Sequence, residues 1–470
     1  MTRLIRGETP EAPRGRQRWG WFAPGLLWMI SSVGSGSVLF TPRIGAQYGY
    51  ELLWVAVIVV ALMWVMIREV GRYTVVTGRS ILEGFSELPG PRGWAIWAVF
   101  LPGIVAGVAV IAGVAALAAS ALIIALPGSI TLYGSIILIV SSAIVLFGRY
   151  RTVESIAAAM SIVLILSVVI TALVVGPDLS AFGAGLIPGL PSDPDWYFIM
   201  PWVGFILAGA GGILWYSYWV AARGFGGTVF DENTDQNTLT ASSSDERLQG
   251  DERVERLRHW VRVMSATALA GVATGGVVII AFLILGAELL KPEGIVPEGI
   301  TVAEDLARLL GQVWGDIGFW VLIVSVIIAL WGTVLSNQDG WPRTFADSVL
   351  VLTAGDTEDD ADRGSLRARL RPLMHRAVLH RASVVVLVTI APLIVLLVVE
   401  DPVAILSVGG IVTAALTPLL VVLTLTINVT HLPRSLQPGW VMRALMVVAA
   451  LFFGAFAVVY FADLFGVALL

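Results

Sequence analysis

Long hydrophobic runs recur along the whole chain, separated by shorter polar connections. Each run is long enough for an α-helix to cross a bilayer, which takes about 18 or more largely apolar residues. Eleven such segments are expected, near 22–42, 50–68, 94–125, 130–148, 155–176, 198–222, 263–290, 315–337, 382–400, 403–428 and 440–468. The pattern predicts an all-α polytopic membrane protein with eleven transmembrane helices.

Basic residues gather in alternate connections between these segments. If the Arg-rich residues 1–21 are a cytoplasmic tail, only Arg43, Lys291 and Arg308 of the 29 basic residues fall outside. Cytoplasmic connections are the ones that normally carry the excess of Lys and Arg. We therefore expect a multi-pass protein of the plasma membrane, with a cytoplasmic N-terminus and an outside C-terminus. No cleavage pattern for a signal peptide follows the tail.

The composition excludes several classes of protein. Hydrophobic residues make up 57% of the chain and charged residues 13%, against about 25% charged in a soluble domain. The absence of cysteine excludes disulfides and Cys-ligated metal sites. No nucleophile–base pair or paired carboxylates share one membrane depth, so we expect no enzyme, no catalytic residue and no cofactor. Nothing indicates nucleic acid as a partner. The strong preference for Arg over Lys suggests a bacterial inner membrane.

Two connections on the expected inner side are highly charged. Residues 223–262 and 355–381 mix acidic and basic side chains, with opposite charges three or four residues apart in the first. Such spacing favours a solvated helix. We interpret both as charged surface at an anionic membrane face, with a regulatory site as the alternative.

Two of the hydrophobic segments are interrupted by small residues near their middle. Gly34–Ser37 lies in the first and Gly209–Gly212 in the sixth. Glycine weakens a helix by about 1 kcal/mol relative to alanine, and broken backbone in a membrane must face protein or a wet cavity. Two broken helices five spans apart are typical of transporters built from inverted repeats, with the cargo between the breaks. Close packing at small residues is the alternative.

This pattern divides the chain into repeats. The first inverted repeat is predicted at 22–176 and the second at 198–428, with an additional helix at 440–468. The cargo is expected to contact small residues and aromatic rings at the two breaks: Gly34, Ser35, Gly36, Ser37, Gly209, Gly211, Gly212, Trp215, Tyr218 and Trp219.

The chemistry of these residues suits a neutral polar solute. Near the breaks the sequence has no Asp, Glu, His, Met or Cys, so we expect no metal site there. Hydroxyls and exposed backbone can bond the polar edge of a sugar, and aromatic rings can pack on its apolar face. An organic cation held over the rings is one alternative, and rings facing lipid or other helices are another.

Ionisable groups that could couple transport to an ion are scarce within the spans. The candidates are Asp339, Glu51 and Glu154, each near a predicted membrane interface. A solvated side chain is the alternative interpretation at such a position. A co-transported proton stays open as a partner, beside the solute and the lipid bilayer.

Four motifs keep a fixed order and spacing in the first span and the residues after it: Pro24–Leu27, the break at Gly34–Ser37, Gly45–Tyr50 and Leu52–Trp54. In order and spacing they resemble PGLL, DPGN, GAQYGY and LLW of the NRAMP family of divalent-metal transporters. The resemblance implies a LeuT-like fold of 5+5 inverted repeats with helices 1 and 6 broken. It also implies alternating access and, in typical members, proton-coupled uptake of Mn²⁺ or Fe²⁺.

The departures from the family fall on its metal ligands. By the resemblance, the ligand Asp and Asn are replaced by Gly34 and Ser37, the ligand Met by Ile213, and the His associated with proton movement by Trp215. A tenth-span Gln corresponds to Ile405. Every side-chain metal ligand that can be placed is thus replaced, which argues against a metal as cargo.

Three hypotheses follow. The main one is an NRAMP-related secondary transporter of a small uncharged polar solute, most plausibly a sugar. The first alternative is a divergent transporter of a divalent metal ion, Mg²⁺ or Mn²⁺, that keeps part of its hydration shell. The second alternative is a non-transporting membrane sensor on the same scaffold.

Overall fold

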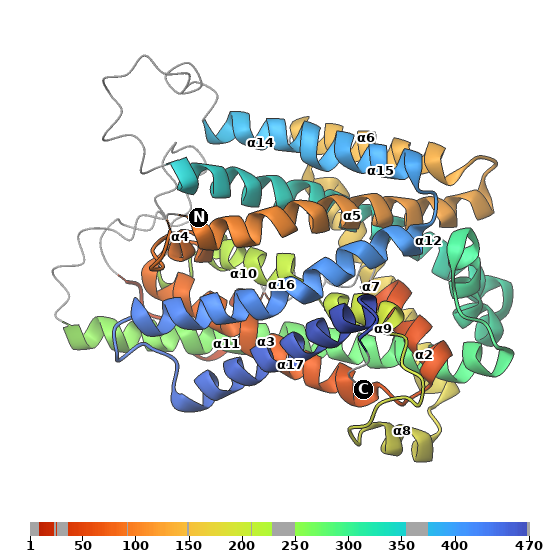
Figure 1. Cartoon of the computed structure of the whole chain (residues 1–470), viewed down its shortest axis with the longest axis horizontal. Coiled ribbons are helices and arrows are strands. Elements are labelled where there is room, and N and C mark those ends of the chain that lie inside the picture. Colours follow the sequence, from red (N-terminus) through yellow and green to blue (C-terminus); the bar gives the residue numbers. More distant parts are fainter. Residues whose placement is uncertain are drawn as a thin grey trace.

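A computed structural model describes residues 9–22, 25, 36–91, 93–147, 150–207, 209–227, 250–353 and 375–467. Most helices run along the long axis of the molecule (Figure 1). The principal helices are α2 (Thr41–Tyr48), α3 (Leu53–Thr77), α4 (Ile81–Ser86), α5 (Trp94–Ala125), α6 (Ile130–Phe147), α7 (Tyr150–Val175), α8 (Leu179–Gly185), α9 (Trp196–Phe205), α10 (Gly209–Arg223), α11 (Gly250–Leu285), α12 (Val302–Thr353), α14 (Arg376–Val385), α15 (Ala391–Val398), α16 (Pro402–Thr430) and α17 (Trp440–Leu464).

Within the described residues, ten helical segments are long and apolar enough to cross a membrane. They correspond to the second to eleventh predicted spans. The first predicted span lies largely outside the described residues, and its described part is a π-helix, η2 (Gly36–Phe40), followed directly by α2. The all-α polytopic fold is confirmed.

Two helices extend beyond the apolar segments predicted from the sequence. The eighth span was expected at 315–337, but α12 runs over 52 residues from Val302 to Thr353, with a kink at Gly315. The seventh helix begins at Gly250, so part of the charged connection 223–262 is helical, as its charge spacing predicted, but it is continuous with the seventh span. In both cases polar residues continue a helix beyond its apolar part, because a helix does not have to end where the hydrocarbon does. Residues 228–249 and 354–374 of the two charged connections lie outside the described residues.

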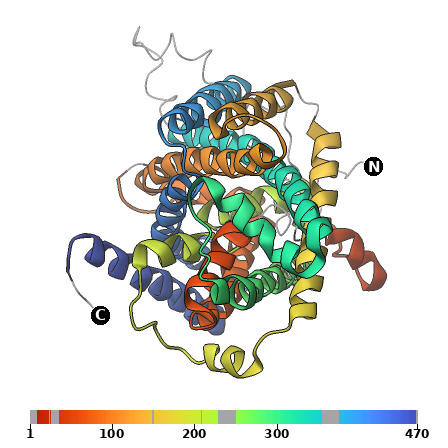
Figure 2. The same ribbon diagram turned by 90° about the vertical axis from the view of Figure 1, so that its right-hand side faces the viewer.

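The helices form a bundle around α5, α12 and α16. Helix α5 packs against both α12 and α16, and α16 packs against α9. Helices α6, α14 and α15 cover one side of this centre, while α7 lies at the edge of the bundle in the end-on view (Figure 2). One end of the bundle carries Arg72, Arg79 and Arg376, and is called here the arginine-rich end; α3 and α10 end there, on the left of Figure 1.

The break in the sixth span lies just before the predicted glycines. Helix α9 ends at Phe205 and α10 begins at Gly209, so the glycine run forms the first turn of α10. Leu207 has φ 66°, which makes it the only residue other than glycine with positive φ among those described, and Gly209 follows with φ 54°. A bulky side chain in this region is strained, and such strain collects at functional sites.

The observed break in the sixth span meets the first span at Gly36, which belongs to the break predicted there from the sequence. A Cβ atom on this residue would lie 2.1 Å from the carbonyl oxygen of Phe205, so only glycine allows η2 to approach the end of α9 this closely. The rings of Phe40 and Phe205 stack beside the contact, with centroids 5.6 Å apart. Helix α9 is held in turn against α16, where a Cβ on Gly204 would lie 2.0 Å from the carbonyl oxygen of Gly410.

A short chain of hydrogen bonds joins the same two half-helices. The Thr41 hydroxyl donates to the carbonyl oxygen of Gly36 over 3.1 Å, and the Trp202 indole N–H donates to the Thr41 oxygen over 3.2 Å. All three groups are buried. The bonds satisfy one carbonyl of η2 and tie α9 to the start of α2.

A buried ion network anchors α3 at the arginine-rich end. Glu69 is fully buried and accepts from Arg72 Nε over 2.7 Å and from Arg68. Asn428 of α16 donates to the Glu69 carbonyl oxygen over 2.9 Å, and Arg72 also donates to the Leu436 carbonyl oxygen over 3.0 Å. The network links α3 to the segment that follows α16.

Gly36→Ala is expected to force η2 and α9 apart, because the added Cβ meets a backbone oxygen that cannot rotate away. The loss of stability should be about 2 kcal/mol or more. Thermal unfolding in detergent measures it. Gly183→Ala is the control: its Cβ has open space within 4 Å, so its melting temperature should stay close to that of the wild type. Equal melting temperatures for both variants would contradict the close contact.

Glu69→Ala is expected to lower stability by about 3 kcal/mol, because it leaves buried arginines without their carboxylate. The matched control is Glu87→Ala, which breaks an exposed pair with Arg79 and should change stability by less than about 1 kcal/mol. Denaturant titration of both purified variants tests the difference. Similar losses would show that the Glu69 network is not the anchor described here.

Candidate functional site

The junction of the two breaks offers hydrogen-bond acceptors but no carboxylate among its described residues. Ser37 is fully buried in η2, and its hydroxyl oxygen has no hydrogen-bond partner among those residues. The last carbonyls of α9 point toward the break without a partner inside the helix. They also form the negative end of the α9 dipole, equivalent to about half an elementary charge. The end of α9 thus favours hydrogen-bond donors and positive charge, whereas the first turn of α10, which starts at Gly209 across the same break, presents N–H groups and the positive end of its dipole.

An aromatic cluster fills the space beside this junction. Trp341 of α12 lies against α5, where Cβ atoms on Gly103 and Gly107 would stand 3.4 and 3.0 Å from its ring. The Trp341 ring also faces Gly211 of α10, where a Cβ atom would stand 2.9 Å from the ring. Trp215 meets Trp341 edge-on, with centroids 5.4 Å apart.

Two further contacts fix the orientation of the rings. Phe345 stacks on Trp341 with centroids 5.4 Å apart. The Trp341 indole N–H donates to Asn337 Oδ1 over 3.2 Å, and that of Trp215 donates to the Thr344 hydroxyl over 3.1 Å. Both indoles are therefore held by hydrogen bonds as well as by packing.

The space left around these rings is small. The cavity between α5, α10 and α12 measures about 10 Å³, which is room for roughly one water molecule. A cargo larger than water therefore enters only after the rings or helices move. The conformation described is closed at this site.

Several contacts hold the helices together at the end of the bundle opposite the arginine-rich one. Arg43 of α2 is buried and donates to the Pro297 carbonyl oxygen over 2.7 Å and to Glu298 over 3.1 Å. Its guanidinium lies 4.3 Å from the centre of the Phe198 ring of α9. Tyr50 donates a hydrogen bond to Glu288 over 2.7 Å. These contacts latch α2 and α9 to the segments between α11 and α12.

The structure gathers only part of the predicted cargo-binding residues. Gly36 and Ser37 lie at the junction with Gly209, and Gly211 and Trp215 lie against Trp341. Gly212 is buried in the first turn of α10. Gly34 and Ser35 lie outside the described residues.

Tyr218 and Trp219 lie toward the arginine-rich end of α10. Tyr218 lies nine positions after Gly209 on the helix, a rise of roughly 13 Å. The two rings are partly buried against the core and lie away from the junction.

Sequence reasoning missed Trp341, Phe345 and Leu207. The two aromatic residues follow Ser336-Asn337-Gln338-Asp339, which marked the end of the predicted eighth span. The continuous helix carries them into the bundle instead. Leu207 gave no signal, since leucine is ordinary in a membrane span.

The candidate coupling residues are not at the junction. Asp339 forms an ion pair with Arg343 over 3.0 Å and is partly exposed. Glu51 is exposed before the start of α3, at the opposite end from the arginines. The side chain of Glu154 lies outside the described residues. Those residues also contain no group of three or more His, Cys, Asp or Glu side chains arranged to hold a metal.

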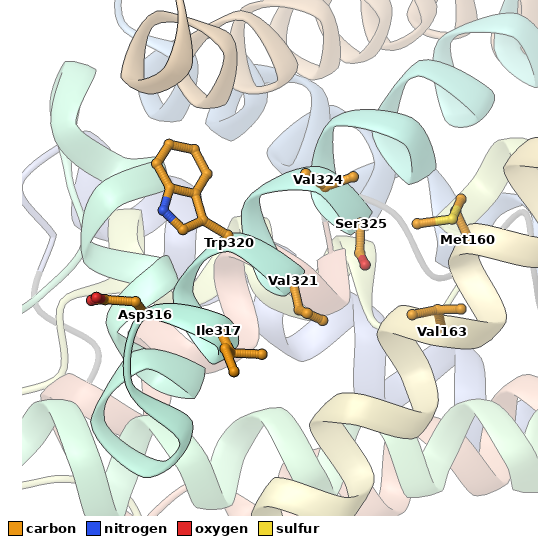
Figure 3. Close-up of a pocket in the computed structure, with 8 residues that line it drawn as sticks. All are labelled: Met160, Val163, Asp316, Ile317, Trp320, Val321, Val324 and Ser325. Atoms are coloured by element: carbon orange, nitrogen blue, oxygen red, sulfur yellow. The ribbon is translucent and has the colours of Figure 1, made fainter.

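A larger groove, of about 500 Å³, lies between α7 and α12. Its lining is almost entirely apolar, with Asp316 at one edge and the buried Ser325 hydroxyl near the middle (Figure 3). Ile317, Trp320 and Val324 are exposed on this face. An apolar exposed groove between two membrane helices suits lipid tails better than a polar cargo.

Solved structures with a similar fold include those of the Eremococcus coleocola manganese transporter. A mutant of that protein matches with a TM-score of 0.62 at 14% identity, covering 98% of this chain and 91% of that one. The same transporter in complex with an aromatic bis-isothiourea substituted compound matches with a TM-score of 0.61 at 15% identity and the same coverage. These similarities confirm the LeuT-like fold. No curated protein matches the sequence.

A family model covers the two broken helices and most of the remaining spans. It is that of the natural resistance-associated macrophage protein-like (Nramp) proteins, and it matches residues 25–339. This range contains the junction, both half-helices of the sixth span and α12 as far as Asp339. Together with the fold, it makes this protein a multi-pass membrane protein and a secondary transporter by type, and not an enzyme. The chain belongs to the Nramp family.

Proposed function

We propose that the protein moves a divalent metal ion by alternating access through the junction of the broken helices, with the ion keeping most of its hydration shell. Membership of the Nramp family supports a cation as cargo, as does the similarity to structures named as manganese transporters. These comparisons favour the metal alternative over the sugar that was first expected, which receives no support from them.

The residues at the junction suggest how such an ion would be held. A hydrated cation presents water molecules that donate hydrogen bonds, and the junction presents acceptors: Ser37 Oγ and the terminal carbonyls of α9. Mg²⁺ in particular gives up its water reluctantly. The observation that carries the proposal is the buried, unpaired Ser37 hydroxyl at the point where the two half-helices meet. It stands beside the negative end of a helix dipole, where a positive charge is stabilised.

The absence of a carboxylate limits the selectivity of this site. Direct coordination of a bare divalent ion without an anionic ligand in low dielectric is unfavourable. At position 213, where the resemblance expects a methionine ligand, the buried side chain is isoleucine. A site without a sulfur ligand cannot favour Mn²⁺ over Mg²⁺ by ligand softness.

An uncharged polar solute is the second candidate. The aromatic cluster of Trp215, Trp341 and Phe345 favours it, because hydrogen-bonded rings beside buried hydroxyls can hold a sugar-like molecule. Like a hydrated ion, this cargo needs the rings or helices to separate, since the present cavity holds about one water molecule.

Purified protein in liposomes is expected to take up Mn²⁺ and Mg²⁺ at similar rates, with a preference below about tenfold. Radiotracer or fluorescent-indicator uptake measures this, against protein-free liposomes. Accumulation of labelled sugars without metal flux would replace the proposal by the second candidate. Binding of a ligand without flux of any kind would indicate the non-transporting sensor.

Ser37→Ala is expected to weaken the apparent affinity for the transported ion by roughly tenfold, the loss of one hydrogen bond to a charged assembly. Ser120→Ala is the matched control, because this buried serine of α5 already donates to the Leu117 carbonyl oxygen over 2.8 Å. Concentration-dependent uptake by both variants separates the effects. Unchanged affinity in Ser37→Ala would remove Ser37 from the cargo site.

A further inference from the structure

A pair of carboxyl groups, Asp347 buried and Glu83 partly buried, lies at the arginine-rich end, apart from the junction. Glu83 lies on α4, which packs against α12 and α10. Asp347 of α12 is 2% exposed and lies close enough to Glu83 for the two charges to repel. Arg376 at the start of α14 forms an ion pair with Asp347 over 3.0 Å.

The other cations nearby are engaged elsewhere. Arg79 pairs with Glu87 at the end of α4, and His431 lies 3.7 Å from the same Glu87. Glu83 itself forms no ion pair within 4.0 Å among the described residues. Of the two carboxyls, Glu83 is therefore the one without its own cation.

Tyrosine hydroxyls complete the surroundings. Tyr73 of α3 faces α4, with its hydroxyl oxygen 2.9 Å from the Cβ position of Gly84. Tyr218 of α10 has a buried hydroxyl beside Asp347, without a hydrogen bond of good geometry to any described residue. Helix α5, which also packs on α4, contributes no titratable side chain.

This arrangement makes Glu83 a group that titrates near neutral pH. Burial and, as the second cause, the negative charge of Asp347 together raise the pKa of Glu83 to about 7, against the opposing influence of Arg79, Arg376 and Ser80. The ordinary pKa is 4.5, so the folded protein binds this proton more tightly than the unfolded chain does. Ionisation of Glu83 thus lowers folding stability as pH rises from 4.5 to about 7.

We propose that Glu83 and Asp347 form a proton-binding site whose occupancy controls the arginine-rich end of α10. With the proton bound, Glu83 is neutral and α4, α10 and α12 pack together around Asp347 and Tyr218. When the proton leaves, two carboxylates face each other with Arg376 as the paired cation, and their repulsion loosens the contact with α10. Release of the proton therefore favours opening of the bundle at this end.

The site differs in place from the coupling candidates that the sequence suggested. Asp339 is already paired with Arg343, and Glu51 is exposed at the opposite end. Only one consequence of the inference, coupling between the proton and the cargo, rests on the proposed transport function. Proton binding itself can be tested without a cargo.

The first experiment is an infrared pH titration of the full-length protein in nanodiscs between pH 5 and pH 9. The wild type is expected to show a protonated-carboxyl band that disappears with a midpoint near pH 7. Glu83→Gln should lack the band, and Glu87→Gln, the neighbouring exposed carboxyl, should retain it. A wild type without the band, or a Glu83→Gln variant that keeps it, overturns the proposal.

Melting temperature gives an independent readout of the same proton. Glu83→Gln removes a carboxyl group that destabilises the fold only in its ionised form. The variant should therefore melt at a higher temperature than the wild type at pH 8. At pH 5 the two should melt within a degree or two of each other. A Glu83→Gln variant that is no more stable than the wild type at pH 8 counts against a buried proton at this position.

Cysteine labelling tests the link to α10. The chain has no native cysteine, so Ser217→Cys places a single buried thiol on α10 next to Tyr218. Its maleimide labelling, divided by that of the exposed control Ala222→Cys, is expected to be several-fold faster at pH 8 than at pH 6. Adding Glu83→Gln should remove this pH dependence. If this labelling ratio does not change with pH in protein that keeps Glu83, the proposal that the proton controls α10 is overturned.

The two proposals fail separately. If no divalent ion is transported but titration and labelling behave as expected, the proton site stands and the cargo assignment falls. If metal flux is seen, but Glu83→Gln changes neither the infrared titration nor the pH dependence of cysteine labelling, the proton site falls and the transport function stands.

Discussion

Where a helix is interrupted inside a membrane, its free backbone N–H and C=O groups still need hydrogen-bond partners or a polar environment. This constraint governs the centre of the protein. Where α9 ends, carbonyl groups leave the helical ladder in a region without bulk water. Two glycine contacts, Gly36 on Phe205 and Gly204 on Gly410, bring three backbones together closely enough to enclose the interruption. The Thr41 hydroxyl, held by Trp202, then donates to the buried Gly36 carbonyl oxygen of η2 at this contact.

The same constraint shapes the chemistry of the site. Closing the breaks with glycine leaves little room for ligand side chains, and the space beside them is filled by Trp341 and Trp215. What faces the junction is backbone oxygen and the Ser37 hydroxyl. A cargo held by these groups must bring hydrogen-bond donors with it. A hydrated cation does so and also matches the negative end of α9.

The fold could be predicted further than the site. The length of the apolar segments predicts the helices, and the two glycine clusters predict that two of them are broken. Both features can be predicted because they follow from local requirements of a bilayer. The break in the sixth span was misplaced by a few residues, since the strain at Leu207 leaves no mark in composition. Trp341 was overlooked because α12 continues past its polar residues. Glu83 and Asp347 are more than 260 residues apart in sequence, and only tertiary packing of α4 on α12 brings them together.

Anomalous X-ray scattering from crystals soaked in Mn²⁺ tests the central claim most directly. The account predicts one peak at the junction between Ser37 and the end of α9. That peak should be separated from every protein atom by the distance of a bridging water, because no carboxylate is present to coordinate the ion directly. A peak bound directly by acidic side chains elsewhere in the chain, or no peak in crystals of a transport-competent protein, would contradict it.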